Sequence, residues 1–183
     1  MNKQEAAAYA KDFVGEWVKV VKDPGAFFAG IEPRDFKKPV QFLITCVGVP
    51  LVIRTLFQVA SALASGGFAE AITGFMISII LAGLTIGFSF LSALVQMGVA
   101  KALGSETSYE HCYWVTAYAA GPLVLSFIPF FDLLMGFYSL FIYFLGVKIV
   151  HQFPAWKALV VILIPALIGA VLNLGPYLKH YLI

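Results

Sequence analysis

Residues 40–64 read VQFLITCVGVPLVIRTLFQVASALA, a continuous apolar stretch in which Arg54 is the one charged residue. A helix of about 20 residues crosses the hydrocarbon core of a bilayer, which is about 30 Å thick. The apolar residues do not alternate with period two, as those of a membrane β-strand do. The stretch therefore predicts a transmembrane helix, which Lys37-Lys38-Pro39 precedes and Ser65-Gly66-Gly67 follows.

The composition of the whole chain agrees with this class. Of 183 residues, 61% are hydrophobic and 12% are charged, whereas soluble domains are roughly 45–50% apolar and about 25% charged. Most charged residues precede Val40, so the segment from Val40 onward is almost uncharged. Because lipid offers no partners to backbone polar groups, we expect an all-α, polytopic membrane protein.

Four more apolar stretches predict transmembrane helices after the first one. With 40–64, the five predicted spans form a transmembrane domain over residues 39–183, and the further four cover 68–103, 108–128, 133–150 and 155–174. A helix over 68–103 would be on the order of 50 Å long, so it must tilt, kink or project from the bilayer. Thr107-Ser108-Tyr109-Glu110 matches a capping box and predicts a helix start near Thr107.

The first 38 residues form a separate, charged segment. Residues 3–22 predict an amphipathic helix with one apolar face, made of Ala6, Tyr9, Phe13, Trp17, Val20 and Val21. Asp23-Pro24 ends this helix and caps a short second one. Such a helix can lie among lipid headgroups or pack on the ends of the spans, and the two placements are compatible.

The distribution of Lys and Arg predicts the orientation. With five spans, ten of the twelve lie on the side of the N-terminus and Lys179 alone lies on the other. Cytoplasmic segments carry the excess of basic residues. We therefore expect a cytoplasmic N-terminus and an external C-terminus.

The order of several short motifs resembles the Yip domain family, the Ypt/Rab-interacting membrane proteins, in its short prokaryotic form. These motifs are Asp23-Pro24-Gly25-Ala26-Phe27-Phe28, Ser108-Tyr109-Glu110, Ala117-Tyr118-Ala119, Ile128-Pro129, Gly146-Val147-Lys148 with His151, Trp156-Lys157-Ala158-Leu159 and Ile164-Pro165. The resemblance implies five spans, a cytoplasmic N-terminus and a bacterial or archaeal cell membrane. Eukaryotic members are associated with Rab-type GTPases, vesicle traffic and membrane shaping. The Asp-Leu-Tyr-Gly-Pro stretch typical of those members is absent from this sequence.

Arg54 is the most informative single residue for function. A charge at its depth in a span costs several kcal/mol unless it is paired or reaches water. The candidate partners are Asp132, in an apolar turn, and Glu70, at the start of the second span, and Asp132 is the better one. Arg54 can be part of an interhelical clamp, or it can line a polar cavity for an anion, a lipid headgroup or a solute.

Several glycines and prolines are candidates for helix contacts and kinks. Gly83 and Gly87 form a GxxxG segment that suits close packing, within the chain or between two copies. Gly121, Pro122 and Pro165 are candidates for kinks. His111 and Cys112 point about 100° apart on a helix, so we predict no metal site with His151, and we expect no cofactor.

The sequence leaves three function classes, of which we favour the first. This is a membrane-organising or adaptor protein with trafficking-like character that contacts the bilayer and a protein partner through its N-terminal segment. The second is a small transporter or channel built around Arg54, and the third is a lipid enzyme. No nucleophile–base pair or phosphate loop appears, so we predict that the protein is not an enzyme. The formal charge of +2 gives no indication of nucleic-acid binding, and a homo-oligomer is compatible with the GxxxG segment.

Overall fold

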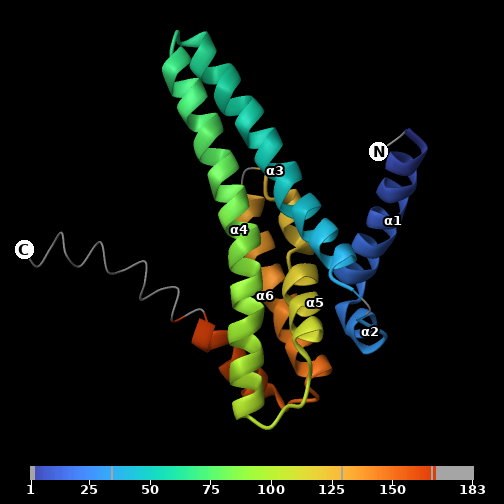
Figure 1. The fold of residues 1–183 in the computed structure, drawn as a ribbon. Coiled ribbons are helices and arrows are strands. Elements are labelled where there is room, and N and C mark those ends of the chain that lie inside the picture. The colour runs from blue at the N-terminus through green and yellow to red at the C-terminus, as the bar shows by residue number, and fades with distance from the viewer. Residues whose placement is uncertain (1–2, 34, 129, 166, 168–183) are drawn as a thin grey trace, which may run out of the picture.

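The computed structural model describes residues 3–33, 35–128, 130–165 and 167, and within them every regular element is a helix. In chain order these are α1 (Lys3–Lys22), α2 (Pro24–Ala29), α3 (Lys37–Ala64), α4 (Phe68–Ala102), α5 (Tyr109–Ala119), the 3₁₀-helix η1 (Gly121–Leu125) and α6 (Phe131–Val150). A shorter apolar helix, Ala155–Pro165, follows. Figure 1 shows α1 and α2 beside one end of the bundle that the other helices form. The predicted all-α fold is confirmed.

Three helices, α3, α4 and α6, are long and apolar enough to cross a membrane. They correspond to the predicted spans 40–64, 68–103 and 133–150. The predicted span 108–128 is divided into α5, of 11 residues, and η1, of 5 residues. The predicted span 155–174 is described only in part, and its residues 168–174 lie outside the described residues. The described residues therefore support three span-length helices, and the count of five remains a prediction.

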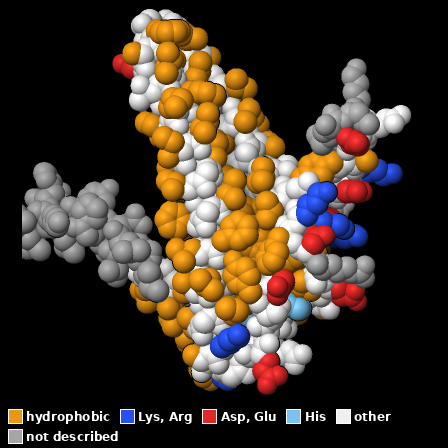
Figure 2. Space-filling view, in the orientation of Figure 1, with side chains coloured by type: hydrophobic (Ala, Val, Ile, Leu, Met, Phe, Trp, Pro, Cys, Tyr) orange, Lys and Arg blue, Asp and Glu red, His pale blue; other side chains and the backbone are white. Residues whose placement is uncertain are grey.

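Helices α3 and α4 form a long hairpin that extends beyond the rest of the bundle (Figure 1). Their 28 and 35 residues correspond to lengths of about 42 and 52 Å. The turn between η1 and α6 meets α3 at Arg54, which leaves ten residues, or about 15 Å, of α3 beyond that turn. This outer part is apolar and exposed, with Phe57 at 74% and Phe68 at 67% (Figure 2). Such a surface is suited to lipid or to another helix.

The core of the bundle lies around α5, which α3, α4 and α6 contact. Tyr113, Val115 and Tyr118 are completely buried. The ring centroid of Tyr118 lies 4.4 Å from that of Phe42, and the ring centroid of Tyr113 lies 4.3 Å from that of Phe90. From Cys112 to Ala119, every residue of α5 except Thr116 is buried, so α5 acts as the central packing element.

Helix α6 can approach α5 closely because Gly146 lies at their contact. A Cβ atom at this position would lie 2.8 Å from Val115 Cγ1 and 3.0 Å from the ring of Phe28. Since such distances are too short for carbon atoms in contact, only glycine fits without displacing Val115 or Phe28. Gly146 thereby joins α2, α5 and α6.

Two helix starts test the predicted caps. Asp23 Oδ1 accepts a hydrogen bond from Ala26 N at 2.9 Å, which confirms the cap of α2. The predicted helix start near Thr107 is confirmed to within two residues, because α5 begins at Tyr109. The predicted capping box is wrong, because Ser108 precedes the helix and its side chain bonds no backbone N–H of it. Instead, the hydroxyl groups of Ser105 and Thr107 pair at 2.7 Å, and Ser108 Oγ lies 3.0 Å from His111 Nδ1. These side chains therefore bond one another, and not the backbone N–H groups at the start of α5 that a cap would satisfy.

Three chain segments meet at the end of the bundle near α1 and α2, which we name the basic end. They are the connection before α3, the loop 103–108 and the turn 151–154. Trp114 Nε1 of α5 donates to Asp35 O in the connection (2.9 Å), and Lys157 Nζ, just after the turn, donates to Leu103 O (2.7 Å). Ser105 Oγ also lies 2.8 Å from His151 Nδ1. The lysines whose side chains the structure describes all lie in α1 or near this end; they are Lys11, Lys19, Lys22, Lys37, Lys38, Lys101, Lys148 and Lys157. The hairpin tip, at residues 65–67, is at the opposite end of the bundle (Figure 1).

Candidate functional site: the docked N-terminal helices and the Arg54 pair

Helix α1 is held against the bundle by apolar and polar contacts. Phe13, Trp17 and Val20 pack on the buried core, with Val20 completely buried. Trp17 Nε1 donates to Gly121 O at 2.8 Å, and Tyr9 OH donates to Gln41 O at 3.0 Å. These residues include four of the predicted apolar face, and they recur at spacings of three and four because one face of a helix repeats at that interval. Val14 and Val18, on another face, are exposed.

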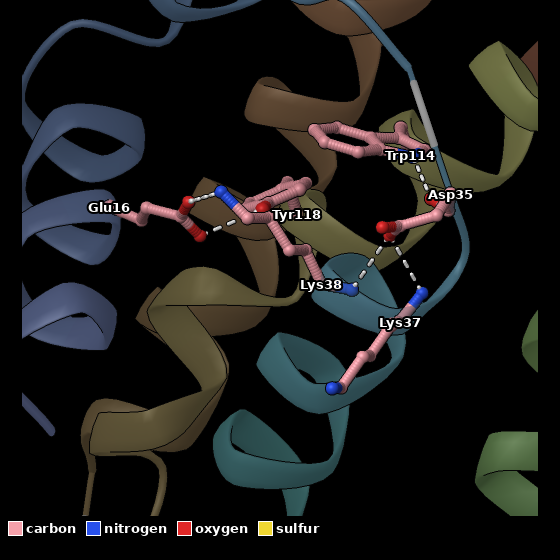
Figure 3. A network of polar contacts seen from close by, with 6 residues as sticks. All are labelled: Glu16, Asp35, Lys37, Lys38, Trp114 and Tyr118. Atoms are coloured by element: carbon pink, nitrogen blue, oxygen red, sulfur yellow. Dashed lines mark hydrogen bonds and ion pairs between the residues drawn. The ribbon is translucent and has the colours of Figure 1, made fainter. Parts of the chain in front are cut away.

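Glu16 is the centre of a polar network that connects α1 with α3 and α5 (Figure 3). Its Oε2 atom accepts a hydrogen bond from Tyr118 OH at 2.8 Å, and its Oε1 atom lies 3.8 Å from Lys38 Nζ. The carboxylate has a charged partner on one side and a buried phenol on the other. Hydrogen bonds to charged groups are stronger than those between neutral groups, so the bond from Tyr118 links α1 firmly to α5.

Asp35 positions the start of α3 in the same region (Figure 3). Its Oδ1 atom accepts hydrogen bonds from the backbone N–H groups of Lys37 (3.0 Å) and Lys38 (3.3 Å). The side chain therefore satisfies N–H groups that no helical carbonyl can reach. Since Asp35 O also accepts from Trp114 Nε1, the entry of α3 is tied to α5.

A polar cleft of about 410 Å³ separates α1 from the first turns of α3. Its lining includes three lysines, two carboxylates and two apolar rings, contributed by Lys11, Lys19, Lys38, Asp12, Glu16, Phe13 and Phe42. Tyr9, Gly15 and Gln41 complete it. The cleft therefore lies between the N-terminal segment and the first span-length helix, and the sequence did not predict it.

Arg54 forms an ion pair with Asp132, at 3.0 Å between Nη2 and Oδ2. Its Nη2 atom also donates a hydrogen bond to the carbonyl oxygen of Ser126. Phe130 has left-handed backbone conformation (φ 70°) and precedes α6, so the chain reverses and Asp132 lies in the first turn of that helix. Of the two predicted partners, the structure brings Asp132 to Arg54, while Glu70 lies in the first turn of α4 near the hairpin tip.

The other sequence candidates lie apart from this pair. Gly83 and Gly87 are exposed, and no described atom outside α4 lies near enough to contact a Cβ there. Gly121 and Pro122 begin η1, where the α-helix ends rather than kinks. Pro165 is near the end of the described part of the last apolar helix.

A buried polar cluster near the basic end was missed by the sequence reasoning. Gln96 is completely buried, its Oε1 atom accepts from Thr116 Oγ1 (3.1 Å) and Tyr143 OH (3.0 Å), and its Nε2 atom lies 3.2 Å from His151 Nε2. Burial, and secondarily the charge of His111, lowers the pKa of His151 to about 4. The available signal was an amide side chain within the apolar stretch 68–103, because a buried amide needs partners.

Metal-ligating residues do not gather in the described structure. His151 Nε2 lies 3.8 Å from Cys112 Sγ, whereas His111 contacts Ser108. Among the described residues, no three His, Cys, Asp or Glu side chains form a group that could hold a metal ion.

Comparison with known proteins identifies the family. The family model of the Yip1 domain matches residues 18–174, a range that begins within α1 and contains all of α2 to α6. No curated protein and no solved structure matches the chain. The match covers most of the chain, and its region contains three apolar helices of span length. The chain therefore belongs to the Yip1 domain family and is an integral membrane protein.

Proposed function

We propose that the protein is a non-catalytic membrane adaptor, which organises the bilayer and a protein partner around its docked N-terminal helices. The observation that supports this proposal most is the fixation of α1. Trp17 and Tyr118 donate hydrogen bonds across the contact between α1 and the bundle. A partner would therefore meet a pre-formed surface, which reduces the ordering entropy that binding costs.

The orientation proposed for this surface is cytoplasmic. The described lysines lie in α1 and near the basic end, and the positive-inside rule assigns such an end to the cytoplasm. The exposed residues Val14 and Val18 are then available to a partner on the cytoplasmic side. In this proposal, the C-terminus is external.

The contacts of Arg54 favour a structural role for that residue. Its guanidinium contacts Asp132 of α6 and the carbonyl oxygen of Ser126, so it connects α3 to the turn before α6. Charged residues in spans that pair with one another avoid the cost of an isolated charge. We infer a clamp between helices.

Site-specific crosslinking in cells tests the adaptor role. A photoreactive amino acid is placed at Val18, which is exposed, and in a control at Phe13, which packs on the bundle. We expect one discrete protein adduct from position 18 and internal crosslinks from position 13. Identical adduct patterns from both positions would contradict a partner surface on α1.

Reconstitution into liposomes tests the absence of transport. We expect no solute flux from the purified protein. Solute-selective flux that disappears in Arg54→Leu would overturn the proposed function, because it would assign Arg54 to a conduction path.

A further inference from the structure

The cleft between α1 and α3 has the chemistry of a binding site for an anion. Lys11 and Lys19 lie eight residues apart on α1, and Lys38 faces them from α3. Residues at intervals of four lie on the same face of a helix, so Gly15 lies between Lys11 and Lys19 and also lines the cleft. Figure 2 shows Lys side chains interleaved with acidic ones over α1, beside the apolar surface of the bundle.

One positive charge of the cleft is not compensated by its own carboxylates. Glu16 is already paired with Lys38 and accepts the hydrogen bond of Tyr118. Among the described residues, neither Lys11 nor Lys19 forms an ion pair, and Asp12 is the one remaining carboxylate of the lining. Two lysines and one carboxylate give a formal charge of +1, which matches a monoanionic phosphodiester.

Gly15 lines an open part of the cleft. A Cβ atom at this position would meet no atom within 4 Å, so packing does not require glycine there. The open space beside Gly15 leaves room for an occupant between Lys11 and Lys19.

The surroundings of the cleft select a lipid over a free anion. Its inner wall is formed by the rings of Phe13 and Phe42. Gln41 of the lining is followed on α3 by Ile44, Val52 and Leu56, which are exposed and apolar, at spacings that continue one side of the helix. An occupant with an anionic head in the cleft could therefore place its acyl chains along α3.

We propose that this cleft binds the headgroup of an anionic, monophosphodiester membrane lipid. Lys11 and Lys19 contact the phosphate, and Gln41 donates to its ester oxygens. The site requires the basic end to lie at a membrane surface but does not depend on the adaptor role, so the crosslinking result and the lipid result are separate.

Lipid binding to the full chain in detergent tests the site. The probes are dioleoyl phosphatidylglycerol, dioleoyl phosphatidylcholine and glycerophosphoglycerol, with bound lipids counted by native mass spectrometry and affinities obtained by titration. The variants are the pair Lys11→Gln and Lys19→Gln, and the control pair Lys101→Gln and Lys148→Gln, which removes the same charge near the basic end. Thermal unfolding verifies that each variant is folded.

We expect one tightly bound phosphatidylglycerol, with weaker binding of phosphatidylcholine and of the headgroup alone. Since each lysine near an anionic surface contributes about a factor of five, the cleft pair should weaken binding by about 30-fold. The control pair should have little effect. Gly15→Leu should weaken binding with every charge retained, whereas the smaller Gly15→Ala should not.

Three results would overturn the site. Equal weakening by the two lysine pairs would indicate general surface electrostatics. Equal affinity for phosphatidylcholine would remove the selection for an anionic headgroup, and equal affinity for the headgroup alone would remove the selection for a membrane lipid. Unchanged binding in a folded Gly15→Leu variant would show that the lipid is elsewhere, and if that variant does not fold, the two lysine pairs decide.

Discussion

Neutralising one member of the Arg54–Asp132 pair should destabilise the protein far more than neutralising both. Arg54 is seventeen residues after the start of α3, or about 26 Å along the helix, with about 15 Å of α3 remaining. Asp132→Asn leaves the guanidinium at this depth with the carbonyl oxygen of Ser126 as its acceptor. An unpaired charge within a span costs roughly 2.5–3.5 kcal/mol.

The size of the effect depends on what surrounds the pair. The two side chains are 50% and 61% exposed to the exterior of the chain. If this exterior were water, the pair would contribute about 0–1 kcal/mol. Because we place it in lipid, we expect each single neutralisation to cost about 2–3 kcal/mol. The double variant Arg54→Gln with Asp132→Asn should fall within about 1 kcal/mol of the parent, since it leaves no unpaired charge.

A double-mutant cycle on the purified protein in mixed micelles measures this coupling. The free energy of unfolding is obtained by titration with a denaturing detergent, followed by circular dichroism. Glu70→Gln is the matched control, because Glu70 is a carboxylate of the predicted outer side in the first turn of α4, and it should change stability by less than about 0.5 kcal/mol. A coupling energy between Arg54 and Asp132 below about 0.5 kcal/mol would refute the clamp.

Charge exchange should restore stability only in part. In Arg54→Asp with Asp132→Arg, the new carboxylate would face the carbonyl oxygen of Ser126, which now accepts from Arg54. Full recovery would show that the Ser126 contact adds nothing to the clamp.

Four further predictions concern packing, pH, docking and topology. Gly146→Ala should lower stability by about 1–3 kcal/mol in thermal unfolding, because its Cβ would overlap Val115 and Phe28. Gly136→Ala on the same helix, where a Cβ has open space, should be neutral or stabilising. Equal losses in the two variants would contradict the packing argument. The folded pKa of His151, about 4, is below its ordinary value of 6.5, so the unfolded state binds more protons between these pH values. The free energy of unfolding should therefore fall as the pH drops from about 6.5 towards about 4. His151→Gln should remove this pH dependence, and a pH dependence retained in that variant would exclude His151 as its source. Tyr118→Phe should cost about 1 kcal/mol by removing the hydrogen bond to Glu16, and no loss would mean that the bond does not hold α1. Accessibility of terminal tags should place the N-terminus inside and the C-terminus outside, and two cytoplasmic termini would rule out five spans.

Local signals in the sequence were sufficient for the elements. Residues 3–22 and the break at Asp23-Pro24 agree with α1 and the cap of α2. The predicted spans 40–64 and 68–103 lie within three residues of α3 and α4. These predictions depend on apolar runs and on Pro and Gly breaks, which act within a few residues. The capping box at Thr107 failed because side chains near it bond one another.

The candidate site required the tertiary structure. Glu16 and Tyr118 are separated by 102 positions, and Gln96 and His151 by 55, so no local pattern relates them. The cleft exists because α1 lies beside the first turns of α3, an outcome of packing between distant segments.

The sequence by itself determined that this chain is a helical membrane protein with a charged N-terminal segment, because hydrophobicity and helix breaks are properties of consecutive residues. It also required that Arg54 be paired with an opposite charge or in contact with water, since a charge within a span is costly. Only the tertiary structure decided that Asp132 and the Ser126 carbonyl oxygen meet Arg54. It also decided that α1 is held through Glu16 and that Lys11, Lys19 and Lys38 share a cleft. These outcomes depend on how distant helices pack against one another, which no single stretch of sequence specifies.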